Sequence, residues 1–131
     1  MGGDGSFMIH IQKSSAYKIG FTVRLKFQIT QHSRDTQLMK NLVKYLGCGW
    51  YKVRPNGLAG DFIVISFTDI IEKIIPFFNL HSPQGVKSLD FANFCKVADI
   101  MKTNDHLTAN GLEQIRLIKS GMNTEREHDK P

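Results

Sequence analysis

Phe21-Thr22-Val23-Arg24-Leu25-Lys26-Phe27-Gln28-Ile29-Thr30 alternates apolar and polar residues without a break. Because side chains of a strand point alternately to its two faces, this run predicts one buried face and one polar face. The run Ser6–Gln12 alternates in the same way, with Phe7, Ile9 and Ile11 on its apolar side. The intervening segment Lys13–Gly20 contains two serines and ends in glycine, so we predict a hairpin with a long loop.

The polar rows of this hairpin carry long hydrogen-bonding side chains and not a single acidic residue. Two interpretations are open. Any half-exposed antiparallel sheet is polar on its solvent side. Alternatively, a two-stranded ribbon fits the DNA major groove, where Arg24 and Lys26 can donate to guanine, and Gln12 and Gln28 can pair with adenine. The missing acids favour the second interpretation, and the net charge of +5 supports it weakly.

Length and composition limit the remaining possibilities. The 131 residues, 41% hydrophobic and 22% charged, predict one globular domain with its own core. No apolar run approaches 18 residues, so we expect no membrane span, and the N-terminus resembles neither a secretory nor a transit signal. Cys48 and Cys95, like the five histidines, lack metal-ligand spacing, so we expect reduced structural thiols and no zinc site. The charged segment 123–131 is expected to be a solvated tail that follows the domain 1–122.

The rest of the chain predicts one helix, a second hairpin and three more helices. The first helix is expected to begin near Ser33 or Asp35 and to end at Gly47. Strands Trp50–Arg54 and Asp61–Phe67 flank a Pro-Asn-Gly turn. Helices are then expected to open at Thr68, at Ser88 and at Thr108 or Asn110, with Pro76 ending or kinking the first of them. The order ββαββααα predicts an α+β fold: a four-stranded antiparallel sheet with helices on one face.

Several short motifs, in this order and spacing, resemble the LAGLIDADG homing endonuclease family, and in particular the C-terminal lobe of the single-chain enzymes of fungal mitochondrial introns. The resemblance covers the chain to about Met122. The motifs are Asp4-Gly5-Ser6-Phe7, Phe27-Gln28-Ile29-Thr30-Gln31-His32, Tyr45-Leu46-Gly47-Cys48-Gly49, Ile74-Ile75-Pro76, Gly85-Val86-Lys87-Ser88-Leu89-Asp90-Phe91 and His106-Leu107-Thr108.

In that family, the concave polar face of each lobe's sheet lies along the major groove of double-stranded DNA. The resemblance implies that Asp4 is the acidic residue that binds a divalent metal such as Mg²⁺, and that Lys87 is a basic residue near the cut phosphate. It also implies the DNA-contacting residues, namely Ser6, Met8, His10, Gln12, Lys18, Thr22, Arg24, Lys26, Gln28, Thr30, Trp50, Lys52, Arg54, Asp61, Ile63 and Ile65.

The name motif of the family is a helix that pairs the two lobes, and only its last positions precede Gly5 here. We therefore expect the apolar side of the sheet to lose cover and to leave Phe7, Ile9, Val23 or Leu25 partly exposed, which favours dimerisation or aggregation. The expected function is one lobe of a mitochondrial, site-specific DNA endonuclease, with a second lobe or a homodimer partner. Two alternatives stay open: a non-cleaving, maturase-like module that binds intron RNA, and a half that is active only with a partner lobe.

Overall fold

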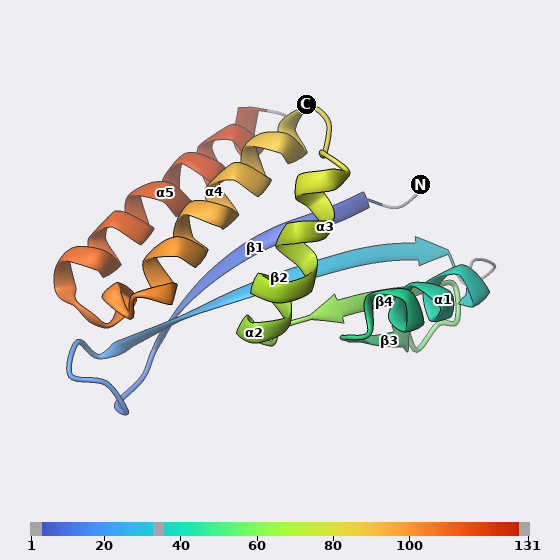
Figure 1. Ribbon diagram of the computed structural model, residues 1–131, viewed down its shortest axis with the longest axis horizontal. Coiled ribbons are helices and arrows are strands. Elements are labelled where there is room, and N and C mark those ends of the chain that lie inside the picture. Colours follow the sequence, from blue (N-terminus) through green and yellow to red (C-terminus); the bar gives the residue numbers. More distant parts are fainter. Residues whose placement is uncertain (1–3, 33–35, 129–131) are drawn as a thin grey trace. The chain divides into compact units, whose positions relative to one another are not determined.

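The computed structural model describes residues 4–32 and 36–128, and its elements confirm the predicted α+β order (Figure 1). Four strands form one antiparallel sheet in the order β1-β2-β4-β3. The strands are β1 (Asp4–Lys13), β2 (Phe21–His32), β3 (Trp50–Val53) and β4 (Ala59–Val64). The helical elements are α1 (Thr36–Leu46), α2 (Phe67–Asp69), η2 (Ile70–Ile74), α3 (Ile75–Leu80), α4 (Val86–Lys102), η3 (Asp105–Leu107) and α5 (Ala109–His128).

The chain forms two compact units. The first combines Met1–Phe7 with Leu25–Ser82, and the second combines Met8–Arg24 with Pro83–Pro131. Each unit contains part of the first hairpin together with its own helices. The two units are therefore described separately.

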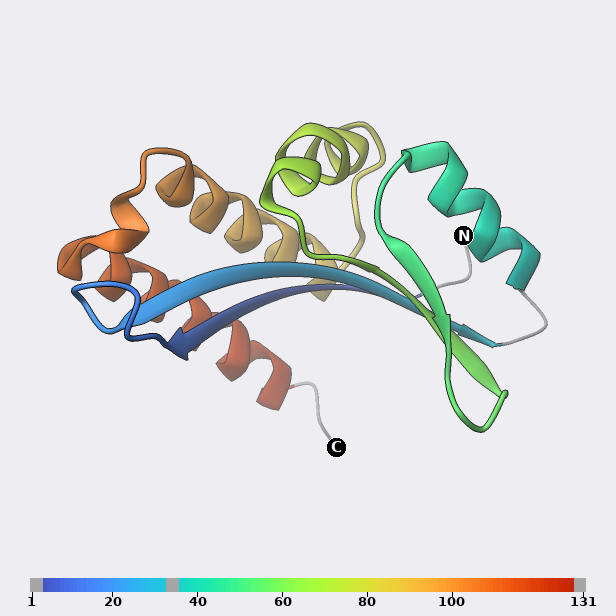
Figure 2. The ribbon, with the colours of Figure 1, turned by 90° about the horizontal axis from the view of Figure 1, so that it is seen from below.

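The core of the first unit is a cluster of aromatic rings on one face of the sheet. The Phe27 ring lies 5.3 Å from that of Phe7 and 5.2 Å from that of Phe78 in α3, and edge-on to that of Phe62 in β4. All four side chains are buried. In the same unit, α1 follows β2 and lies beside the β3–β4 hairpin (Figure 2). Gly47, with a φ of 67°, ends α1 and donates its N–H to the Val43 carbonyl.

In the second unit, α4 and α5 lie side by side, and α5 also contacts the first hairpin (Figure 1). The Lys119 ammonium donates a 2.7 Å hydrogen bond to the Ile9 carbonyl, and the Arg116 guanidinium lies 4.7 Å from the centre of the Phe21 ring. The hairpin loop closes as expected, because the Ser14 N–H donates to the Gly20 carbonyl across 2.9 Å.

The expected exposure of the apolar side of the first hairpin is wrong. Phe7, Ile9, Val23 and Leu25 are at most 4% exposed. The reason is that the chain's own helices cover this face: α3 places Phe78 against Phe7 in the first unit, while α5 lies on the hairpin in the second.

Several helix and strand limits also differ from the prediction. Strand β4 ends at Val64, and the next helix begins at Phe67 because the Ser66 hydroxyl, not Thr68, accepts the capping N–H of Asp69. Pro76 does not end that helix. Pro76 directly follows a π-helical segment, in which the Ile75 N–H donates to the Ile70 carbonyl, so the helical hydrogen bonding is already irregular where the N–H of Pro76 is missing.

The later helices show two further differences. Helix α4 begins after Gly85, whose φ of 59° suits glycine, and Ser88 donates its hydroxyl to the Gly85 carbonyl instead of opening the helix. Helix α5 begins beside Thr108, as predicted, but continues to His128, into the segment expected to be a tail. The expected cap residues Ser33 and Asp35 of α1 lie outside the described residues.

Candidate nucleic-acid interface

The strand register places the predicted polar residues of the first unit on one face of the sheet. In one row across the strands, Ile63 of β4 pairs with Gln28 of β2 and with Trp50 of β3. In the next row on the same face, Asp61 of β4 pairs with Thr30 of β2 and with Lys52 of β3. Directly paired residues of antiparallel strands share a face. The alternate positions, including Phe27, Ile29, Phe62 and Val64, are buried on the opposite face. Three adjacent strands thus form a continuous, partly exposed surface, with Trp50 43% exposed on the edge strand β3.

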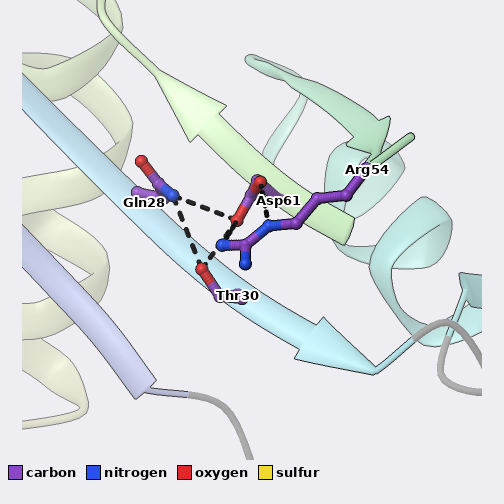
Figure 3. Close-up of polar contacts among 4 residues, drawn as sticks. All are labelled: Gln28, Thr30, Arg54 and Asp61. Atoms are coloured by element: carbon purple, nitrogen blue, oxygen red, sulfur yellow. Dashed lines mark hydrogen bonds and ion pairs between the residues drawn. The ribbon is translucent and has the colours of Figure 1, made fainter. Parts of the chain in front are cut away.

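Four of these residues form a hydrogen-bonded cluster centred on Asp61, which we call the Asp61 cluster: Gln28, Thr30, Arg54 and Asp61 (Figure 3). The Arg54 guanidinium binds the carboxylate in bidentate fashion, with Nε 3.1 Å from Oδ2 and Nη2 3.1 Å from Oδ1. Oδ1 also accepts from the Thr30 hydroxyl at 2.7 Å and from Gln28 Nε2 at 3.0 Å. The Gln28 amide nitrogen additionally lies 3.4 Å from Thr30 Oγ1.

These hydrogen-bond donors keep the Asp61 carboxyl group ionised. The Arg54 hydrogen bonds, together with those from Thr30 and Gln28, hold the pKa of Asp61 below its usual value of 3.8, although partial burial acts in the opposite direction. The carboxylate is therefore charged near neutral pH, and it can only accept hydrogen bonds. Charge-assisted bonds of this kind are stronger and more directional than neutral ones, so the cluster holds its side chains in defined orientations.

The polar positions of the first hairpin alternate with the buried residues Phe7, Ile9, Val23 and Leu25, as predicted, while Ile11 and Phe21 near the loop are partly exposed. Arg24 and Gln12 are exposed, while the others are partly exposed; these are Ser6, Met8, His10, Thr22 and Lys26. Ile65 is 47% exposed but follows the end of β4, so it is not part of the strand row.

The remaining predicted site residues lie on a loop, a helix and the start of β1. Lys18 is exposed in the loop of the first hairpin, and Lys87 is partly buried in the first turn of α4. Asp4 opens β1, but its side chain lies outside the described part of the structure. The roles assigned to Asp4 and Lys87 therefore stay predictions.

Within residues 4–32 and 36–128, no group of three or more His, Cys, Asp or Glu side chains could hold a metal ion. In the same ranges, no helix is long and apolar enough to span a membrane. Cys48 is buried and Cys95 partly buried, and both are free thiols whose pKa is raised, mainly by burial.

The sequence prediction placed Gln28, Thr30, Arg54 and Asp61 on one surface but missed their mutual hydrogen bonds. A signal was available: Asp61 is the only acidic residue within the four predicted strands, and Arg54 lies close across a short hairpin turn. Opposite charges on neighbouring strands of one face attract each other.

Comparison with known proteins places these features in a family. The LAGLIDADG endonuclease family matches residues 1–98. "Probable intron-encoded endonuclease 2" of Neurospora crassa is 40% identical over 103 residues, and "Probable intron-encoded endonuclease 3" of the same fungus is 31% identical over 115 residues. These matches cover 79% and 88% of this chain, but the chain spans only 23% and 21% of those proteins.

Solved structures agree with this assignment. The I-SmaMI LAGLIDADG homing endonuclease bound to cleaved DNA superposes with a TM-score of 0.88 at 46% identity, over 94% of this chain and 41% of that one. I-LtrWI, a LAGLIDADG homing endonuclease bound to target DNA, gives a TM-score of 0.87 at 43% identity, over 92% of this chain and 41% of that one. With its sheet, its helices and its sequence all matching, the chain belongs to the LAGLIDADG endonuclease family.

Proposed function

We propose that this chain is a DNA-recognition lobe of a site-specific homing endonuclease and that the polar face of its sheet contacts base edges in the major groove. The observation that carries the proposal is the register of β2, β4 and β3, which lines up polar side chains of three strands opposite a buried apolar face. Residues two apart on a strand are separated by about 6.5 to 7 Å, which is roughly two base-pair steps.

The relatives support double-stranded DNA as the partner, because I-SmaMI and I-LtrWI are both bound to DNA. The chain spans about two fifths of each of those proteins, so we further propose that cleavage requires a second lobe or a second copy. Because the related Neurospora proteins are intron-encoded, we propose that this chain acts in intron homing, and that it does so in the mitochondrion.

I-SmaMI has also been captured on an uncleaved target in the presence of calcium ions. A divalent metal at such a site activates water and stabilises the leaving oxygen. The described residues alone do not form a metal site. We propose that Asp4 supplies one carboxylate of a Mg²⁺ site that the second lobe completes, and that Lys87 acts near the cut phosphate.

The test is selection of bound duplexes from a randomised library at physiological salt, with Arg24→Ala as the probe variant. Lys96→Ala, which removes one positive charge from an exposed position of α4, is the matched control. We expect the natural chain to enrich one sequence, Arg24→Ala to lose preference at one base position by about tenfold, and the control to select as the natural chain does. Binding that enriches no sequence and fades with salt would contradict the proposal, as would preferential retention of structured RNA.

Cleavage is tested separately, in Mg²⁺ with a LAGLIDADG-bearing second lobe added. We expect Asp4→Asn to abolish cutting while binding persists, and Lys87→Ala to reduce cutting more than binding. Unchanged cutting by Asp4→Asn would remove Asp4 from the metal site.

A further inference from the structure

The Asp61 cluster restricts which hydrogen-bonding groups the polar face can offer to DNA. Asp61 accepts four hydrogen bonds, three of them on Oδ1. A carboxylate has about four acceptor sites, so little of its capacity is left for a base. The side chain is also only 14% exposed, whereas that of Arg54 is 46% exposed. The influence of Asp61 on base choice therefore acts through its neighbours.

Gln28 is the first of these neighbours. Because the Asp61 carboxylate can only accept, the amide nitrogen of Gln28 must face it, which fixes the orientation of the amide group. The two hydrogens of Nε2 are directed to Asp61 Oδ1 and Thr30 Oγ1. The oxygen atom Oε1 points away from Asp61 (Figure 3). Gln28 thus presents an acceptor and has no amide hydrogen to spare.

This orientation changes what Gln28 can recognise. A glutamine that contacts adenine in bidentate fashion must accept from N6 and also donate to N7. With its donors engaged, Gln28 can only accept, and both adenine N6 and cytosine N4 offer a donor in the major groove. Guanine and thymine present an acceptor at the corresponding position, which an outward oxygen repels.

Arg54 is the second neighbour. Nε and one hydrogen of Nη2 are bound to Asp61, which leaves the edge formed by Nη1 and Nη2. That edge carries two parallel N–H groups, the arrangement that binds guanine O6 and N7. An arginine held by a carboxylate also has fewer rotamers to lose on binding, so its contact with one base is favoured over diffuse contact with phosphate.

We propose that Asp61 is a specificity-determining positioning residue, which turns Gln28 into a reader of the amino bases adenine and cytosine and presents the Nη1/Nη2 edge of Arg54 to guanine. This inference rests on the proposed major-groove contact of the polar face. It adds the class of base that Gln28 and Arg54 recognise. It also proposes that Asp61, which contacts no base itself, sets this preference.

The test compares base preferences, selected from a randomised duplex library, for the natural chain, four variants of the cluster and one control variant. Gln28→Ala and Arg54→Ala first identify the base position that each residue contacts. At the Gln28 position, we expect the natural chain to accept adenine and cytosine within about threefold of each other and to disfavour guanine and thymine by about tenfold.

Thr30→Val separates the two halves of the cluster, since it removes the acceptor for one Gln28 hydrogen but leaves the Arg54 pair intact. We expect adenine to become preferred over cytosine by about tenfold at the Gln28 position, with the guanine preference of Arg54 unchanged. Asp61→Asn should change both positions, and the guanine preference should fall by about tenfold. Asp99→Asn makes the same chemical change at an exposed site on α4 and should leave both preferences as they are.

The possible failures differ from one another. If the natural chain selects no sequence, the proposed groove contact fails and this inference fails with it. If the natural chain selects a sequence and Asp61→Asn and Thr30→Val select the same one, even with uniformly weaker binding, the groove contact stands and the positioning role of Asp61 is overturned. Thr30→Val keeps the test decisive if Asp61→Asn does not fold.

Discussion

Replacing Gly111 by alanine is expected to destabilise the protein, although the same change at Gly121 in the same helix should stabilise it. Both glycines lie in α5, where alanine has the higher helix propensity by up to about 1 kcal/mol. A Cβ at position 121 would meet nothing within 4 Å. A Cβ at position 111 would overlap the backbone carbonyl of Asp105 and lie 3.1 Å from Thr108 Oγ1.

The expected loss in the free energy of unfolding for Gly111→Ala depends on the groups that a Cβ at position 111 would displace. The Asp105 carbonyl accepts hydrogen bonds from the Thr108 N–H and hydroxyl, and the Thr108 hydroxyl in turn caps the Gly111 N–H at 3.0 Å. Overpacking against backbone costs about 1–3 kcal/mol, and loss of an N-cap costs about 1 kcal/mol. After the gain in helix propensity, Gly111→Ala should lower the free energy of unfolding by about 1–3 kcal/mol. Gly121→Ala should raise it by about 0.5–1 kcal/mol.

Urea denaturation followed by circular dichroism measures both changes against the natural chain. For a domain of this size, 1 kcal/mol corresponds to about 4 °C in Tm, so thermal melts give an independent check. Gly121→Ala also controls for the unfolded state, because both variants lose the same backbone freedom of glycine. The reasoning is refuted if Gly111→Ala unfolds at the same urea concentration as the natural chain, or at a higher one.

Two further predictions concern His106 and Phe78. Burial lowers the pKa of His106 below its usual 6.5, and its buried Nδ1 makes no hydrogen bond within the described part of the chain. The unfolded state therefore takes up a proton at a higher pH than the folded state does, so the free energy of unfolding should fall as pH drops below about 6.5. The free energy of unfolding of the natural chain and of His106→Gln can be measured by chemical denaturation between pH 5 and 8. We expect it to fall less steeply with decreasing pH in the variant, and the same pH dependence in both proteins would contradict this prediction. Phe78→Ala should cost about 3–5 kcal/mol, because the ring contacts those of Phe7 and Phe27, and a loss under about 1 kcal/mol in urea denaturation would show that the cluster is not a core.

The strands and their faces could be predicted from alternation alone because a period of two leaves no other regular structure for Phe21–Thr30. The ends of strands and helices were harder to predict where two local signals compete. Ser66 and Thr68 are both good helix-capping residues, and the largely apolar run before Thr68 fits a strand that continues to Phe67. The structure ends β4 at Val64 because Ser66 caps the following helix. The effect of Pro76 could not be predicted from the sequence, because a π-helical segment before it lets the helical run continue past the proline.

The Asp61 cluster could be predicted only as a set of residues on one face. Its hydrogen bonds depend on the offset between β2 and β4, which pairs Thr30 with Asp61, and that offset joins segments about 30 residues apart. A shift of this register by two residues would keep Asp61 on the polar face but pair it with a different residue of β2, and nothing within either strand alone excludes that shift. The burial of Phe7 likewise depends on Phe78, a residue far along the chain.

The shared hydrogen bonds of the Asp61 cluster have a consequence for evolution and for protein engineering. Residues that share one carboxylate are not expected to have additive effects, because replacing Arg54 releases acceptors that then act on Gln28 and Thr30. Under the proposed groove contact, a change of target sequence at the base position of one cluster residue is expected to alter the preference at the base position of another. Library designs that vary one residue at a time should therefore suit a position outside the cluster, such as Arg24, whereas Gln28, Thr30, Arg54 and Asp61 need to be varied together.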